Sequence, residues 1–153
     1  MRTVLVALVA FLVLQSPASL AGQTAPTKLT VYGDVAYFWG MGNPMNCVLT
    51  SRFKRGEPMG FRVTALDPVT GERDRASKLV VHLTYGGKTI DLPMRDRQTE
   101  AQPERAFFVA KWVVPADAPV GIVKYTVSAT DSKGRTGEFK PFDVQTSQIT
   151  IIE

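Results

Sequence analysis

Two thioethers and a thiol lie close together in the sequence, because Met41, Met45 and Cys47 form the pattern M-x3-M-x-C within the segment YFWGMGNPMNC. Sulfur ligands of this kind, together with imidazole, are the set that binds copper, and Cu(I) in particular. The only histidine, His82, would supply the imidazole, so these four residues are the candidate metal ligands. Packing is the competing and stronger interpretation, since methionine fills irregular gaps in cores and free cysteine is commonly buried.

Cys47 is the only cysteine, and it therefore cannot form a disulfide within the chain. It is a buried small side chain, a free thiol, a metal ligand or an intermolecular bridge that links two copies into a homodimer. A blue-copper electron-transfer site needs two histidines beside its cysteine, and this chain has one. We therefore expect no cofactor, and copper is the alternative.

Residues for acid–base or nucleophilic catalysis are scarce. No Ser-His-Asp or Cys-His pair can form without His82, which lies in the middle of a predicted strand and is expected to be a surface residue. Acid pairs occur at Asp67 and Glu72 and at Asp91 and Asp96, but they belong to turns and charged loops, whereas acid–base catalysis needs a cleft. The sequence contains no GxGxxG, P-loop, HExxH or CxxC motif. We expect that the protein is not an enzyme.

Three adjacent aromatic residues precede the sulfur residues. Neighbouring residues of a strand face opposite ways, so Tyr37 and Trp39 share one face and Phe38 takes the other. One set is expected in the core, and the other is either covered by the chain or presented to a partner, for which Trp and Tyr are preferred anchors. Burial on both sides, in a segment that crosses between two sheets, is the competing interpretation. The predicted partner-binding surface consists of Tyr37, Trp39, Met41, Asn43 and Met45.

The elements that position these residues follow an N-terminal targeting segment. Residues 1–21 have one arginine, an apolar run from Val4 to Leu14 and small residues at Ser19 and Ala21, which is the layout of a secretory signal peptide. The apolar run is shorter than the roughly 20 residues that a membrane span needs. We therefore predict a signal peptide at 1–21, a flexible N-terminus at 22–27 and one domain at 28–153, with no membrane span after cleavage.

Short alternating segments separated by turns fill the rest of the chain. Period-2 alternation rich in Val, Thr, Tyr and Phe is typical of half-buried strands. Turns are predicted at 67–71, at Gly86-Gly87 and at 131–134, and residues 95–105 are expected to form a long exposed loop. The predicted strands are 28–32, 61–65, 78–85, 106–114, 123–129, 139–144 and 148–152. This pattern predicts an all-β fold, an antiparallel sandwich of about seven or eight strands.

The end of the chain resembles a known family. The segment WVVPADAPVGIVKYTVSATDSKGRTGEFKPFDV contains a Pro-Asp-x-Pro-x-Gly corner that runs from Pro115 to Gly121, followed by a Tyr-Thr-Val-x-Ala-x-Asp strand that starts at Tyr125. It resembles the closing hairpin of bacterial immunoglobulin-like domains, and this resemblance covers about a third of residues 22–153 closely. It implies an immunoglobulin-like sandwich without the disulfide of antibody domains, and says little about activity, since such domains have many functions.

These observations together predict an exported, non-catalytic binding or accessory module. Its positive charges are scattered among acids, which argues against a nucleic-acid partner. We expect it in the bacterial periplasm, docked on another periplasmic or cell-surface protein. A periplasmic copper-binding protein that uses Met41, Met45, Cys47 and His82 is the alternative.

Overall fold

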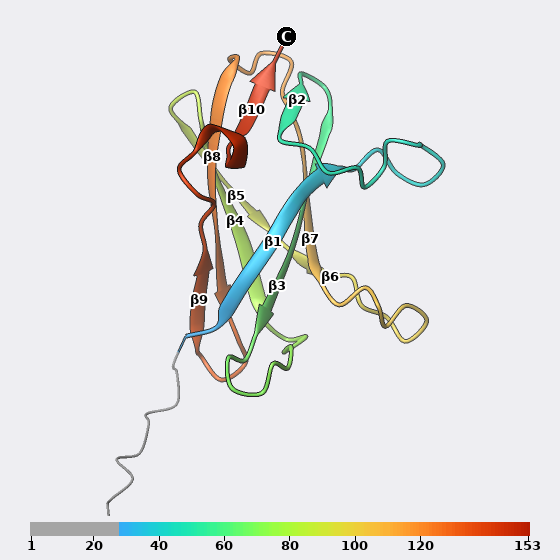
Figure 1. The fold of residues 1–153 in the computed structure, drawn as a ribbon, viewed down its shortest axis with the longest axis vertical. Helices are drawn as coiled ribbons and strands as arrows, with labels where there is room; N and C mark the ends of the chain where they lie inside the picture. The colour runs from blue at the N-terminus through green and yellow to red at the C-terminus, as the bar shows by residue number, and fades with distance from the viewer. Residues whose placement is uncertain (1–27) are drawn as a thin grey trace, which may run out of the picture.

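A computed structural model describes residues 28–153, and in this part of the chain β-strands predominate (Figure 1). The predicted signal peptide (residues 1–21) and flexible N-terminus (residues 22–27) lie outside the described residues. The elements are β1 (Thr30–Tyr37), β2 (Arg52–Lys54), β3 (Pro58–Leu66), β4 (Lys78–Tyr85), β5 (Lys88–Pro93), β6 (Arg95–Asp96), β7 (Phe108–Val113), β8 (Gly121–Thr130), β9 (Thr136–Phe139), the 3-10 turn η1 (Gln145–Ser147) and β10 (Ile149–Ile152).

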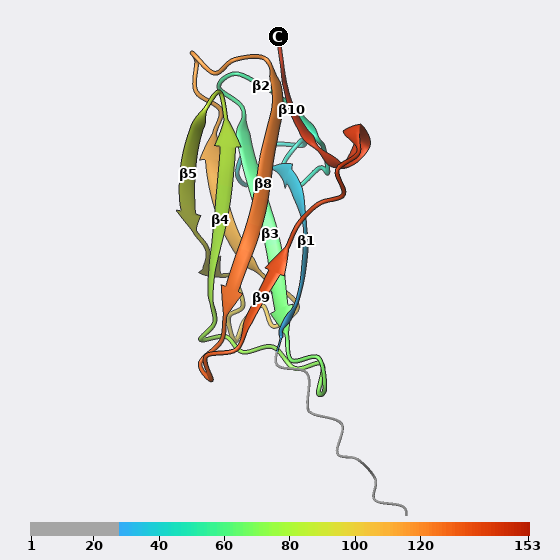
Figure 2. The same cartoon turned by 90° about the vertical axis from the view of Figure 1, so that its left-hand side faces the viewer.

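The strands form two sheets that face each other (Figure 2). A four-stranded sheet has the order β1-β3-β7-β6, and a six-stranded sheet has the order β2-β10-β8-β4-β5, with β9 also paired to β8. The named strands pair antiparallel except β10 and β2, which are parallel. The prediction of an all-β antiparallel sandwich is confirmed. The strands are more numerous than predicted, because β2 and β6 are only three and two residues long and the predicted strands did not include β5, which follows the Gly86-Gly87 turn.

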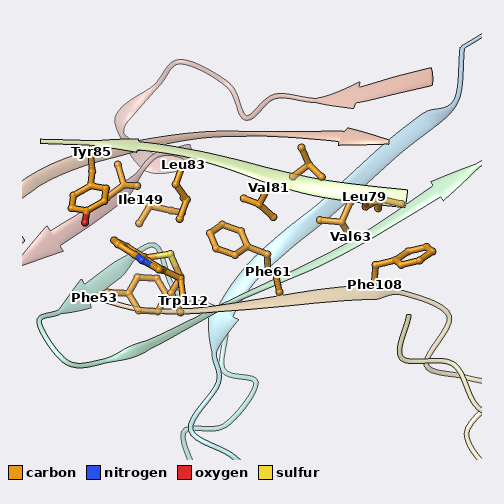
Figure 3. Close-up of a cluster of buried hydrophobic side chains, with 14 of the residues drawn as sticks. Phe53, Phe61, Val63, Leu79, Val81, Leu83, Tyr85, Phe108, Trp112 and Ile149 are labelled. Carbon is orange, nitrogen blue, oxygen red and sulfur yellow. The ribbon is translucent and has the colours of Figure 1, made fainter. Parts of the chain in front are cut away.

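The core lies between the two sheets, as Figure 3 shows. Alternate residues of β4, from Leu79 to Tyr85, are buried as their period predicts. They meet Phe61 from β3 and Trp112 from β7, and the rings of Tyr85 and Trp112 lie 5.0 Å apart. Large side chains from both sheets thus fill one continuous apolar layer without a disulfide.

The first strand is longer than the predicted 28–32, because β1 continues to Tyr37. Gly33 and Asp34, two residues that are rare in strands, hide this continuation in the sequence. A Cβ atom on Gly33 would lie 2.3 Å from the carbonyl oxygen of Arg62, so only glycine allows this close approach of β1 and β3. Asp34 instead accepts two hydrogen bonds from the Arg62 guanidinium, at 2.7 and 2.8 Å, across the same strand pair.

The predicted strand at 139–144 is wrong. β9 pairs with β8 from Thr136 to Phe139, and the chain then leaves the sheet and returns as β10. Pro141 has no backbone N–H to donate to a neighbouring strand, which explains why residues 139–144 do not continue as a strand. Figures 1 and 2 show this excursion swinging out between β9 and β10.

Candidate functional site

Residues 38–50, here called the 38–50 loop, fold back onto the end of β1. The backbone N–H of Tyr37 donates to the carbonyl of Val48 at 2.9 Å, and the N–H of Cys47 donates to the carbonyl of Tyr37 at 2.7 Å. A third bond joins the N–H of Thr50 to the carbonyl of Val35 at 3.3 Å. These bonds fix the base of the loop on the sandwich, while its tip projects from the fold (Figure 1).

The tip of the loop is ordered by its own polar groups. The Asn43 side-chain oxygen accepts a hydrogen bond from the N–H of Met45 at 2.8 Å, and that of Asn46 accepts one from Gly40 at 3.1 Å. Gly40 and Gly42 adopt φ values of 103° and 87°, which only glycine reaches without strain. Asn43, predicted as a partner contact, therefore also holds the turn in shape.

The aromatic residues alternate between faces as predicted. The rings of Tyr37 and Trp39 lie 6.3 Å apart, whereas the Phe38 ring covers Gly60 on the outer face of β3. Tyr37 packs against the buried ring of Phe53 at 5.1 Å, and its hydroxyl donates to the Arg52 carbonyl at 3.3 Å. Burial, followed by the charge of Glu57, raises the pKa of Tyr37. Tyr37 therefore supports the loop from below, and its ring belongs to the edge of the core.

The remaining predicted contact residues are exposed. Met41 is 99% exposed, and Trp39 and Met45 are 41% and 45% exposed. Val48 and Leu49, which the sequence analysis did not select, are exposed on the return arm of the same loop. The sequence signal for these two was the apolar pair directly after the tip, with no alternating pattern to place it in a sheet. The exposed set, here called the loop patch, consists of Trp39, Met41, Met45, Val48 and Leu49.

Cys47 is an exposed free thiol, so the interpretation of this residue as a buried small hydrophobe is wrong. Its backbone φ is 65°, and among residues 28–153 it is the only residue other than glycine with a positive φ. This backbone geometry turns the chain at the base of the loop and presents the side chain to solvent. Cys47 thus lies beside the loop patch and not beneath it.

His82 lies on the outer face of β4, in the opposite sheet from β1, and the structure does not bring it to the sulfur residues of the loop. Its Nδ1 lies 2.7 Å from an Asp91 carboxylate oxygen and its Nε2 lies 2.8 Å from the Ser128 hydroxyl. This environment favours the tautomer in which Nδ1–H donates to Asp91 and Nε2 accepts from Ser128. Within residues 28–153, no group of three His, Cys, Asp or Glu side chains gathers as a metal site.

The acid pairs of the sequence analysis take part in separate networks. Asp67 accepts hydrogen bonds from Arg135 and from the backbone of Val69 and Thr70, and these lower the pKa of Asp67 to about 2. Burial opposes ionisation of Asp96, but hydrogen bonds from Arg73 and Arg75 lower the pKa of that carboxyl overall. Carboxylates with such low pKa values stay ionised at neutral pH and cannot donate a proton there.

Exposed cationic residues follow the loop patch in the sequence. From Val35 to Gly56 the chain contains three cationic residues, Arg52, Lys54 and Arg55, and no acidic one. Arg52 and Lys54 are exposed on β2, directly after the loop. Two acids border this stretch, Asp34 before it and Glu57 after it, and Asp34 is paired with Arg62.

The fold and the loop define the chain as an all-β sandwich protein with a projecting apolar loop. No known family model matches the chain, and no curated protein is significantly similar to it. Among residues 28–153, no helix combines the length and the hydropathy that a bilayer crossing requires.

Proposed function

We propose that this protein is an exported, non-catalytic binding module that docks on another protein of the cell envelope through its loop patch. The single observation that carries the proposal is a loop with a fixed base and five exposed apolar side chains. Scattered exposed apolar residues are normal on a monomer, but a contiguous group of them marks an interaction site. The export step rests on the predicted signal peptide.

An immunoglobulin-like identity of the sandwich is part of this proposal. In that fold, one sheet has the order A-B-E-D and the other contains C, F and G. The orders β1-β3-β7-β6 and β4-β8-β9 agree with this scheme when the strands receive those letters in chain order. Antibody domains link B and F by a disulfide. Here the corresponding strands contribute Phe61 and Tyr125, whose rings lie 5.3 Å apart.

The loop has the properties of an interface anchor. Methionine side chains adapt to irregular partner surfaces, and tryptophan is enriched among residues that dominate binding energy. Because the backbone of the loop is held at both its base and its tip, less conformational entropy is lost when a partner binds. The exposed cationic residues Arg52 and Lys54, on β2 directly after the loop, favour a partner whose apolar contact surface has an acidic rim.

Retention of envelope proteins on the immobilised domain tests the proposal. We expect a specific partner to be retained by the unchanged protein and lost, by about tenfold or more, when Trp39 and Met41 are both replaced by serine. Val69→Ser is the matched control, because Val69 is 64% exposed on a different loop. A partner that is retained equally by all three proteins would exclude the loop patch as the docking surface.

Copper binding is the second candidate, because Met41, Met45 and Cys47 occupy one short loop and all three are exposed. A thiolate and two thioethers suit Cu(I), and His82 is not part of this ligand set. Native mass spectrometry of the protein purified from its own host tests it. A mass excess of one copper ion that disappears in Cys47→Ser would support the site, and a metal-free chain would exclude it.

A homodimer linked through Cys47 is the outcome that the same spectra distinguish. The dimer would appear at twice the monomer mass, and a reductant would convert it to monomer. A metal-bound monomer would appear at the monomer mass with and without mild reductant. The docking proposal predicts that Cys47→Ser leaves partner retention unchanged.

A further inference from the structure

A cavity of about 220 Å³ lies on the outer face of the six-stranded sheet, apart from the loop patch. One side of it is formed by β4 and β8, and the other by the excursion between β9 and β10, here called the 140–148 segment. Figure 2 shows β4 and β8 side by side and the excursion beyond β9. The residues around the cavity come from sequence positions as far apart as 82 and 148, so no local sequence motif predicts the cavity.

The floor of the cavity consists of polar side chains on the outer face of β4 and β8. Val81, Leu83, Val123 and Val127 point into the core, and the alternate residues therefore point outward. The register pairs His82 with Thr126 and Thr84 with Lys124, which places these four side chains on the same face. The His82 ring is held in one orientation because Nδ1–H donates to Asp91 and Nε2 accepts from Ser128.

The wall is built by the 140–148 segment, where the ladder is broken at Pro141. The Gln148 amide donates to an Asp143 carboxylate oxygen at 2.5 Å, and the N–H of Ser147 donates to the carbonyl of Val144 at 2.9 Å. Phe142 is 81% exposed at the cavity although a phenylalanine ring gains free energy when it is buried. The segment thus holds a large aromatic ring in solvent beside a polar floor.

The charge of the lining favours an anion. Lys124 and Lys140 both line the cavity, and neither takes part in the ion pairs found among residues 28–153. The one carboxylate of the lining, Asp143, already accepts a hydrogen bond from Gln148. Two unpaired ammonium groups, hydroxyl groups from Thr84 and Thr126 and an exposed ring therefore meet in one hollow.

We propose that this cavity binds a single sugar ring that carries a carboxylate. The apolar face of a sugar can stack on Phe142, the threonine hydroxyls can exchange hydrogen bonds with the sugar hydroxyls, and the lysines can pair with the carboxylate. The volume is below the roughly 300–1,000 Å³ of sites for drug-sized ligands, which fits one ring and not an extended chain. This site is separate from the docking surface, and neither proposal depends on the other.

Titration of the isotopically labelled protein, observed through its backbone amide resonances, tests the proposal with three probes. Galacturonate carries both ring and carboxylate, galactose lacks the carboxylate, and inorganic phosphate lacks the ring. We expect galacturonate to shift the resonances of Thr84, Lys124 and Phe142 and to bind about tenfold more tightly than either other probe. Equal binding of galactose would exclude the anion contact, and equal binding of phosphate would exclude the ring contact.

Two pairs of variants locate the site. Lys124→Gln and Phe142→Ala should each weaken galacturonate binding by about tenfold. Lys111→Gln and Val144→Ala are the matched controls, since Lys111 is an exposed strand lysine of the other sheet and Val144 is exposed but does not line the cavity. No binding by the unchanged protein, or equal losses in variants and controls, would overturn the proposal.

Discussion

Single side chains at the base of the 38–50 loop connect it to the sandwich. Phe38 and Tyr37 leave β1 on opposite faces, one over Gly60 and the other against Phe53. Each contact fixes one side of the base of the loop to the sandwich, and the tip projects from this fixed base. Residue-level changes at this base are therefore expected to act on the loop first.

Gly60→Ala tests the packing of Phe38. A Cβ atom at position 60 would lie 2.0 Å from the nearest ring atom of Phe38, so the ring must move away. We expect a loss of about 1–3 kcal/mol in the free energy of unfolding, measured by urea denaturation. In a double-mutant cycle, Phe38→Ala should make the glycine substitution nearly harmless, and strict additivity of the two changes would contradict the contact.

Asp67 predicts how stability depends on pH. Its folded-state pKa of about 2 lies below the ordinary value of 3.8, because Arg135 and two backbone N–H groups bind the carboxylate. A depressed pKa contributes stability that is present above about pH 4 and is lost as the pH falls toward 2. We expect the melting temperature to fall between pH 5 and pH 2, and Asp67→Asn to reduce that fall.

Asp117→Asn is the matched control for this prediction, because Asp117 is exposed and outside the ion pairs of residues 28–153. It should leave the pH dependence of the melting temperature unchanged. An equal effect of both substitutions would show that the Asp67 environment is not the cause.

At the scale of the elements, the strands whose inward faces are purely apolar could be predicted from the sequence. The bounds of β4 match the prediction, because its period is unbroken from Lys78 to Tyr85. β1 was predicted too short, since the close approach at Gly33 and the ion pair of Asp34 depend on β3, which lies far along the chain. The wrong strand at 139–144 came from an alternating pattern that Pro141 interrupts.

Because Phe61 packs between the two sheets, we expect its replacement by a small side chain to lower the stability of the fold strongly. This side chain is fully buried, and its ring lies 5.3 Å from the ring of Tyr125 on the opposite sheet. We expect Phe61→Ala to lower the free energy of unfolding by about 3–5 kcal/mol. Val113→Ala, on the exposed outer face of β7, should change it by no more than about 0.5 kcal/mol.

The whole molecule has two candidate binding surfaces, the loop patch and the cavity on the six-stranded sheet. They differ in how well the sequence predicts them. The loop patch was largely predictable, because Trp39, Met41 and Met45 are close in sequence and flanked by turn residues. The packing of the Tyr37 ring against the core could not be predicted from the sequence, since it depends on Phe53. The cavity on the six-stranded sheet could not be predicted, because it exists only when β4 and the 140–148 segment come together.

Site-specific photo-crosslinking in intact cells would show whether the loop patch contacts a partner protein, as we propose. A photoreactive amino acid would replace Met41 in one strain and Val69 in another, two exposed apolar positions on different loops. We predict a discrete crosslinked product, larger than the monomer and resistant to reductant, from position 41 and none from position 69. No product from position 41, or the same product from both positions, would contradict the claim.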